Sequence, residues 1–304
     1  MTSINIELLL TIIFTHVDDW CKKNRERVLK RTVGRRPEFS DSEVITLMVA
    51  EEFIPYPAEG QYIEYIRANH LALFPRILEQ SQFNRRGRAL GGVMEKMRRD
   101  WFVATGLGME NSYLIDTKPI PVVGYKRRKK HSGFQGNADY GYCASRNLHY
   151  YGYKLVMLTT LSGVPVAYDL VPANTDERKS SEAILDVVKG AKIIGDKGFL
   201  GAEWQAKVYS ETGNEVITPK RKNQKEQHPD GFEATLNRVR ERIEGVFNEL
   251  QNTGRNLERL LAKTITGLCT RIIAKVTSHL VKYMLRQKYQ IDVQTFTCTG
   301  DMVF

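Results

Sequence analysis

The sequence predicts an α/β protein: a mixed five-stranded sheet, with an all-helical module before it and a helical extension after it. Three observations support this prediction. Residues 1–108 have helical periodicity, residues 109–255 alternate strand-like and helix-like segments in the order β-β-β-α-β-α-β-α, and residues 256–304 return to an amphipathic helical pattern. We expect these three ranges to be the domains of the chain.

The first range carries start and stop signals of helices. Ser40 and Glu43 have the Ser-x-x-Glu spacing of a capping box in front of an apolar run, and a basic helical stretch follows Ser81. Proline and glycine residues at 55–60 interrupt the pattern, and a short helix is expected around residues 62–69. The range therefore predicts a helical module.

Hairpins and crossovers together build the predicted sheet. The expected strands are residues 112–123, 152–161, 164–171, 191–196 and 215–219, with Ser162-Gly163 as the tight turn between the second and third. Helices precede the fourth and fifth strands, so the right-handed crossover rule lets the fourth strand lie parallel beside the first. In such sheets a site forms where the winding direction switches, and these two strands flank that point.

Each of the two flanking strands carries an aspartate. Asp116 lies in the first strand, and Asp196 follows the fourth between Gly195 and Gly198. The glycines indicate that something small approaches the chain closely there. Taken alone, a strand-end Asp followed by Lys-Gly is a common turn former. Asp169 ends the third strand, away from the switch point.

The long helix at about 232–251 supplies a third acidic residue. Its apolar stripe, which must face the sheet, consists of Leu236, Val239, Ile243, Val246 and Leu250. Glu244 lies on one flank of this stripe, beside Arg240, and could reach round the edge of the sheet. Glu241 points away, and Glu249 lies on the opposite flank. The alternative for Glu244 is a surface ion pair with Arg240.

Three segments carry these acids: LIDTKPI around Asp116, IIGDKGF around Asp196 and RVRERIEGVFNEL around Glu244. In them the chain resembles bacterial insertion-sequence transposases of the DDE type, which have an RNase H-like core, and specifically the IS-nine-eighty-two family. The similarity covers about residues 110–255, and FSDSEVI and LFPRILEQSQFNRR earlier in the chain also resemble that family. Related transposases carry Tyr, Arg, Glu and Lys on the last helix. Here the Arg and Glu are present, but Asn237 and Gln251 replace the Tyr and Lys.

The resemblance implies that Asp116, Asp196 and Glu244 are the catalytic residues and the ligands of two Mg²⁺ ions, for which Mn²⁺ can substitute. Mg²⁺ prefers oxygen ligands, and neither the cysteines nor the histidines of this chain cluster in sequence. Two ions about 3.5 to 4 Å apart can activate a water or a 3′-hydroxyl and stabilise the leaving oxygen of a phosphodiester.

The expected function is that of a DNA transposase, which cleaves the ends of its element and joins the 3′-hydroxyl to target DNA. Two alternatives stay open: an RNase H-like metal-dependent nuclease without strand transfer, and a non-catalytic DNA-binding protein. The helical module is expected to recognise the terminal repeats through a basic helix with Arg85, Arg86, Arg88, Lys96, Arg98 and Arg99.

Positive charge supports a DNA partner. The net charge is +10, and the residues after 110 hold 29 basic against 20 acidic groups. Runs at 126–130 and 220–222 are each common in solvated loops, but one polyanion partner explains both. The residues predicted to contact DNA are Lys126, Arg127, Arg128, Lys129, Lys130, Lys197, Lys220, Arg221, Lys222 and Arg240.

An aromatic stretch lies near the first basic run. It contains Tyr140, Tyr142, Tyr150, Tyr151 and Tyr153, which either pack in the sheet or stack on bases. The chain has no apolar run of roughly 20 residues and no basic n-region before its first apolar segment. We expect a protein of the bacterial cytoplasm that acts on DNA, and a homodimer in the active complex because two ends are cut together.

Overall fold

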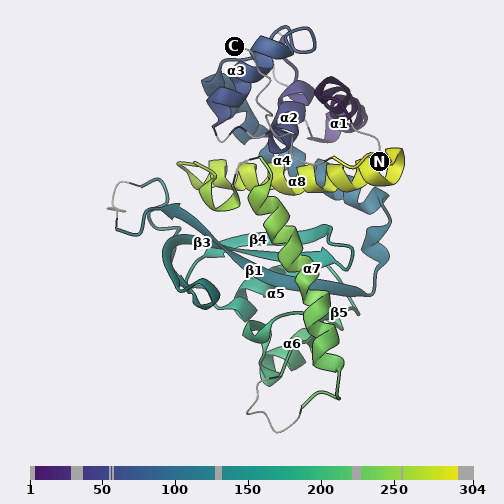
Figure 1. Cartoon of the computed structure of the whole chain (residues 1–304), viewed down its shortest axis with the longest axis vertical. Coiled ribbons are helices and arrows are strands. Elements are labelled where there is room, and N and C mark those ends of the chain that lie inside the picture. The colour runs from purple at the N-terminus through teal and green to yellow at the C-terminus, as the bar shows by residue number, and fades with distance from the viewer. Residues whose placement is uncertain are drawn as a thin grey trace. The chain divides into compact units, whose positions relative to one another are not determined.

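The computed structural model of the chain describes residues 4–28, 37–54, 56, 58–126, 132–220, 227–254 and 256–293. It separates into a helical unit, residues 1–104 with 250–304, and a sheet-containing unit, residues 105–249 (Figure 1). The expected C-terminal extension, residues 256–304, thus groups with the N-terminal helices. No helix within the described ranges is long and apolar enough to cross a bilayer.

The helical unit is built from α1 (Ile6–Val28), α2 (Asp41–Ala50), α3 (Glu59–Asn69), α4 (Gln80–Ala104) and α8 (Ile265–Tyr289). Ser40 caps α2 as predicted, because its side chain accepts from the Glu43 backbone N–H at 3.1 Å while a Glu43 carboxyl oxygen accepts from the Ser40 N–H at 2.6 Å. The helix α8 packs against α2 and α4.

A buried ion pair connects α8 to the short 3₁₀ helix η1 (Glu51–Phe53) of the same unit. The Lys275 ammonium lies 2.7 Å from the Glu52 carboxylate, and the two side chains are 1% and 3% exposed. Lys275 also donates to the Thr253 carbonyl at 2.8 Å. Two charges removed from water in this way require each other.

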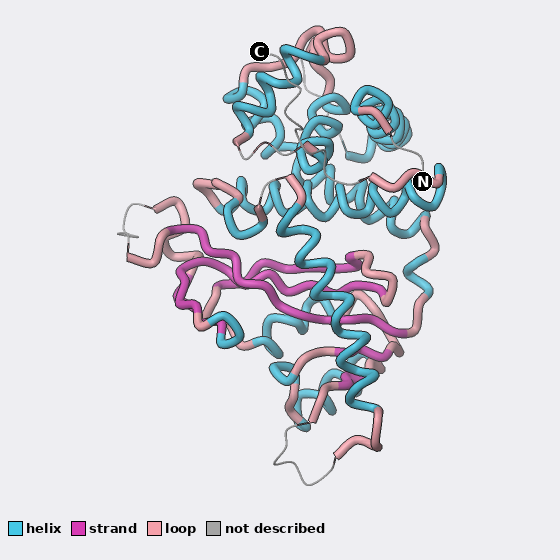
Figure 2. Tube along the Cα trace, in the orientation of Figure 1, coloured by secondary structure: helices cyan, strands magenta, loops and turns pink. Residues whose placement is uncertain are grey.

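The sheet-containing unit has the mixed, RNase H-like strand arrangement that the resemblance implies. Its strands are β1 (Ser112–Val123), β2 (Asp139–Cys143), β3 (Leu148–Thr160), β4 (Pro165–Pro172), β5 (Lys192–Ile194) and β6 (Glu215–Ile217). β3 pairs antiparallel with β1 and β4, and β1 pairs parallel with β5, which pairs parallel with β6. The predicted position of the fourth expected strand, β5, beside the first is confirmed (Figure 2).

In the described residues the sheet contains the five expected strands and one more, β2, which pairs antiparallel with the beginning of β3. Asn147 adopts the left-handed conformation, φ 46°, in the connection between them. The pairing extends β3 back to residue 148, four residues before the expected start at 152. Alternating tyrosines at 140 and 142 were a usable strand signal, since successive strand residues point to opposite faces.

Helices cover both faces of the sheet. α5 (Glu177–Leu185) packs against β3 and β4, and α6 (Ala202–Thr212) against β6, whereas α7 (Phe232–Asn252) crosses the front of the sheet in Figure 1. In α7, Ile243, Val246 and Phe247 are buried. An Arg242 guanidinium N–H donates to the Leu161 carbonyl at 3.0 Å, which ties α7 to the β3–β4 turn.

Candidate active site

The parallel pairing of β1 with β5 places two aspartates near each other. Its last pair is Leu114 with Ile194, and Asp116 and Asp196 each lie two residues beyond that pair on neighbouring parallel strands. The negative charge of Asp196 acts on Asp116 and raises its pKa. The structure therefore brings together two of the three acids that the sequence singles out.

One carboxylate oxygen of each aspartate accepts a hydrogen bond from a backbone N–H. Asp116 accepts the Thr117 backbone N–H at 2.7 Å through Oδ1. Asp196 caps the 3₁₀ helix η4 (Lys197–Phe199) by accepting the Gly198 N–H at 2.7 Å, also through Oδ1. Within the described residues, no hydrogen bond to either Oδ2 is found. Both carboxylates thus keep an oxygen that can bind a ligand.

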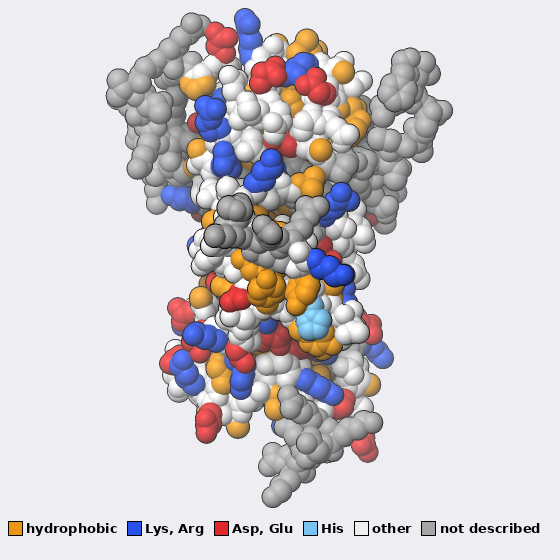
Figure 3. Space-filling view, turned by 90° about the vertical axis from the view of Figure 1, so that its left-hand side faces the viewer, with side chains coloured by type: hydrophobic (Ala, Val, Ile, Leu, Met, Phe, Trp, Pro, Cys, Tyr) orange, Lys and Arg blue, Asp and Glu red, His pale blue; other side chains and the backbone are white. Residues whose placement is uncertain are grey.

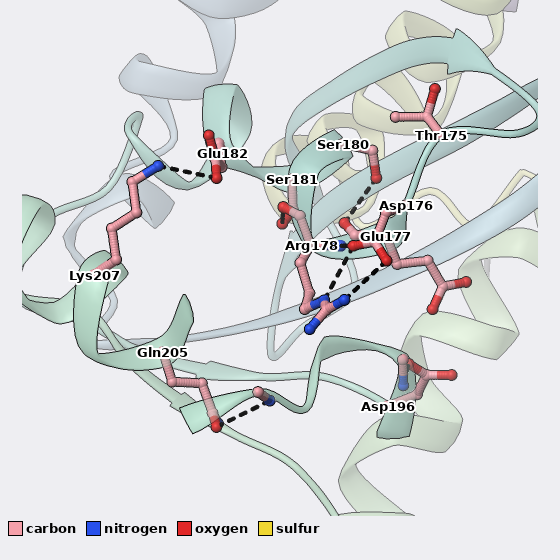
Figure 4. Close-up of polar contacts among 12 residues, drawn as sticks. Thr175, Asp176, Glu177, Arg178, Ser180, Ser181, Glu182, Asp196, Gln205 and Lys207 are labelled. Atoms are coloured by element: carbon pink, nitrogen blue, oxygen red, sulfur yellow. Dashed lines mark hydrogen bonds and ion pairs between the residues drawn. The ribbon is translucent and has the colours of Figure 1, made fainter. Parts of the chain in front are cut away.

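A third carboxylate near the two aspartates is Glu177, which the sequence analysis did not single out. It is the first residue of α5, and its Oε1 accepts the Thr117 hydroxyl at 3.1 Å and lies 3.9 Å from the Lys154 ammonium. The Asp196 charge raises the pKa of Glu177, although burial is the larger cause. In Figure 4 the carboxyl groups of Glu177 and Asp196 lie on the same side of the picture, one above the other.

Gly198 allows this close approach. A Cβ atom at position 198 would lie 1.5 Å from Glu177 Oε2 and 2.9 Å from Asp196 Oδ1, so any other residue would displace the Glu177 carboxylate. Gly195 has a different neighbourhood, since its Cβ would meet Phe199 at 2.9 Å and Ile115 at 3.0 Å. Gly198 therefore leaves room for a carboxylate of the same chain, and the approach of an ion or a phosphate to Asp196 stays a prediction.

The gathered negative charges change the acidity of the site. Burial is the largest cause that raises the pKa of Asp116 to about 7, and the charges of Asp196 and Glu177 raise it further, against the Thr117 N–H and Arg240, which lower it. Burial also raises the pKa of Glu177, with the Lys154 ammonium acting in the opposite direction. Carboxylates that repel each other in this way favour a bound cation.

The donor chemistry of the site fits a hard divalent ion such as Mg²⁺, because Asp116, Asp196 and Glu177 offer only carboxylate oxygens. In the ranges that the structure describes, however, no three His, Cys, Asp or Glu side chains lie close enough together to hold a metal ion. The ligand set predicted from the sequence, Asp116, Asp196 and Glu244, therefore stays a prediction.

The position of Glu244 follows from that of Arg240. Arg240 is half-buried, and its charge acts on Asp116 and lowers the pKa of that carboxyl. Glu244 lies one turn further along α7 and is exposed. Asp169, the other acid considered from the sequence, lies on β4 opposite Val156 of β3. Its Oδ1 accepts the Leu170 N–H at 2.8 Å.

The structure describes four of the predicted DNA-contacting cations. Lys126 and Lys197 are exposed, Lys220 and Arg240 are half-buried, and the Lys220 backbone N–H donates to Glu233 at 2.9 Å. The other predicted contacts lie outside the described residues: Arg127, Arg128, Lys129, Lys130, Arg221 and Lys222.

A groove of about 520 Å³ adjoins the acidic residues. Its lining includes Glu177 and Gly198, Tyr140 and Tyr142 of β2, and Lys154. In the lower half of Figure 3, apolar side chains and a histidine lie above a recess with acidic side chains.

A mixed sheet with aspartates on or just beyond two paired parallel strands is the arrangement of the RNase H-like class of proteins. A family model described as a transposase DDE domain matches residues 108–261, half of the chain, and the chain belongs to this family. A solved structure described as a Mos1 transposase paired-end complex with left transposon end aligns over 87% of this chain and 84% of that chain, at 12% identity and a TM-score of 0.22. No curated protein sequence matches.

Proposed function

We propose that this chain is the transposase of a bacterial insertion sequence of the IS-nine-eighty-two family. It cleaves the ends of its element and joins the freed 3′-hydroxyl to target DNA, acting in the bacterial cytoplasm. The observation that supports this proposal best is the convergence of Asp116 and Asp196 beyond the last β1–β5 pair, inside the segment that matches the DDE family.

In this proposal Asp116, Asp196 and Glu244 hold two Mg²⁺ ions, and Glu177 adds a fourth carboxylate beside them. Bound divalent ions activate the attacking oxygen and stabilise the leaving oxygen of a phosphodiester. The side chains of Lys197 and Arg240 neutralise phosphates of the DNA at the site, and those of the basic runs at 126–130 and 220–222 do so along the approach to it.

A plasmid that carries the gene with its flanking DNA tests the proposal. With purified full-length protein and Mg²⁺, we expect cut ends and products in which a cut end is joined to a second plasmid. Asp116→Asn, Asp196→Asn and Glu244→Gln should each abolish both products and keep DNA binding. Asp169→Asn, at an acid on β4, which pairs with β3 and not with β1, is the matched control and should keep activity.

A titration with Mn²⁺ alone provides a readout that does not depend on activity. Calorimetry should detect binding to the wild-type protein and strongly reduced binding to Asp116→Asn. Full cleavage by all three acid variants would contradict the proposal. Cut ends without joined products would select the nuclease, and DNA binding with neither Mn²⁺ binding nor cleavage would select the non-catalytic alternative.

In this proposal the helical unit recognises the terminal repeats. The contacts of the α4 side chains indicate which of its basic residues are available to bind DNA. Arg98 is buried and bonded to Glu95 at 2.8 Å, and Arg86 bonds to Asp41 and the Phe39 carbonyl. Arg85 and Arg88 are exposed. Replacing both by Ala in the full chain should remove the footprint on the terminal DNA, and an unchanged footprint would count against this assignment.

A further inference from the structure

The ribbon formed by β2 and β3 separates the tyrosine stretch into two faces. Tyr140 lies opposite Tyr151 and Tyr142 opposite His149, so these four side chains share one face. The other face carries Tyr150, which is 4% exposed and packs over Gly141, where a Cβ would lie 2.8 Å from the Tyr150 ring. Packing therefore explains Tyr150 and, on the first face, Tyr151, which is 6% exposed, whereas Tyr140, Tyr142 and His149 are exposed.

The rings on the first face form a continuous row with Tyr125. Ring centroids are 4.6 Å apart for Tyr142 and His149, 6.0 Å for His149 and Tyr125, 5.7 Å for Tyr125 and Tyr140, and 5.0 Å for Tyr140 and Tyr151. Tyr142 is 53% exposed, Tyr140 and Tyr125 are each 49% exposed, and His149 is also exposed. We call these five residues the aromatic row.

Exposed aromatic rings next to one another indicate a binding surface, because a folded chain ordinarily buries them. Tyr140 and Tyr142 also line the groove to whose lining Glu177 and Gly198 contribute. Lys126, which is exposed, follows Tyr125 directly in the chain and adds a positive charge beside the row. The row thus continues from the candidate active site and combines flat apolar faces with a cation.

Unpaired nucleotides have the matching chemistry. Their base faces are open to stacking on aromatic rings, whereas the bases of a duplex are already stacked on one another, and their phosphates pair with cations. We propose that the aromatic row binds unpaired nucleotides of the DNA that the acidic site acts on. This inference rests on the proposed function, because it takes DNA as the substrate.

The test measures binding of a fluorescently labelled oligothymidine and of a labelled duplex to the full chain, in a chelator so that cleavage plays no part. Tyr142→Leu and Tyr140→Leu should each weaken binding of the single strand by roughly 5- to 150-fold. Binding of the duplex should change less than about twofold, because paired bases present no free faces. Tyr142→Phe and Tyr142→Trp keep a ring and should retain binding of the single strand. Tyr209→Leu, at a 63% exposed tyrosine of α6, is the matched control.

Three results would overturn the inference: unchanged binding of the single strand, equal losses for single strand and duplex, or an equal loss in Tyr209→Leu. Self-association that Tyr142→Leu abolishes would assign the row to a second copy of the chain and also overturn it. Failure of the proposed function is separate. If the wild-type protein binds the single strand through the row but does not cleave DNA, the proposed function fails and the present inference stands. If Tyr142→Leu cleaves DNA normally and binds the single strand normally, only the present inference fails.

Discussion

At the scale of single residues, Gly198 and Glu177 depend on each other. The Cβ of Gly198→Ala would overlap Glu177 Oε2, so the Glu177 carboxylate must move from its present position. Because displaced groups around a metal site reduce affinity about 10- to 100-fold, we expect Gly198→Ala to weaken Mn²⁺ binding by that factor. Calorimetric titration of the full chain measures this loss.

Comparing Gly198→Ala in the wild-type protein and in a Glu177→Ala variant shows whether its effect on Mn²⁺ binding acts through Glu177. In a Glu177→Ala background the added methyl has no carboxylate to displace, so Gly198→Ala should cause little further loss there. Gly92→Ala, where a Cβ meets open space, is the control. Equal losses from Gly198→Ala in both backgrounds would show that Glu177 is not the reason for the glycine.

The raised pKa of Asp116 predicts a pH dependence of stability. With a folded-state pKa of about 7, above the ordinary value of 3.8, the folded protein holds the proton more tightly than the unfolded chain. The stabilisation from this proton is complete below about pH 4, is lost as the pH rises through about 7, and is constant above that. In a chelator, the free energy of unfolding should therefore fall by roughly 2 to 4 kcal/mol over this range relative to Asp116→Asn.

Urea titrations at pH 4, 5.5, 7 and 8.5 measure this difference. A divalent cation binds the ionised carboxylate, so Mg²⁺ should reduce the dependence. Identical pH profiles for the wild-type protein and Asp116→Asn would refute the raised pKa.

At the scale of elements, the capping box at the start of α2 contributes to the stability of a largely buried helix. In Ser40→Ala the Glu43 backbone N–H loses its side-chain acceptor, and we expect the free energy of unfolding to fall by about 1 kcal/mol. The same substitution at the exposed Ser81 of α4 is the control and should have almost no effect. Ser40→Asp keeps an acceptor, and if it is destabilised as much as Ser40→Ala, the cap is not the cause.

The element β2 determines where the aromatic residues point. Pairing with β3 places Tyr140 and Tyr142 on one face and leaves Tyr150 on the other. A tyrosine-rich stretch by itself does not separate these roles, since alternation assigns two faces but does not identify which of them is covered.

At the scale of the whole molecule, residues far apart in sequence depend on each other, and the Glu52–Lys275 pair of the helical unit is the clearest case. Lys275→Met leaves the buried Glu52 carboxylate without its ammonium partner, so the free energy of unfolding should fall by about 3 to 5 kcal/mol. Replacing the pair jointly, by Glu52→Leu with Lys275→Met, should recover most of that loss.

Denaturant unfolding of both variants measures these effects, with Lys207→Met as the control. Lys207 pairs with Glu182 at 3.1 Å, but both side chains are about half exposed, so its loss should cost less than about 1 kcal/mol. A joint variant as unstable as Lys275→Met would show that the packing, and not the charge, is responsible.

Local signals in the sequence were enough to predict most of the elements, although not β2, and the two aspartates. The capping box at Ser40, the turn at Ser162-Gly163 and the boundaries of β1 follow from signals within a few residues, and the crossover rule sets β5 beside β1. Such signals act locally, so they can be read without knowing what packs against them. The same local signals predict that Asp116 and Asp196 lie close together. Once β1 and β5 are known to pair, their register alone determines which residues are neighbours.

Only the tertiary structure decided that Glu177 belongs beside these aspartates, that Gly198 accommodates it, and that Tyr140 and Tyr142 face outward. The first residue of α5 resembles any acidic residue in the first turn of a helix, where a negative charge is ordinarily favourable. Its proximity to Asp196 depends on how α5 lies on β3 and β4, and this placement results from packing among side chains that are distant in the chain.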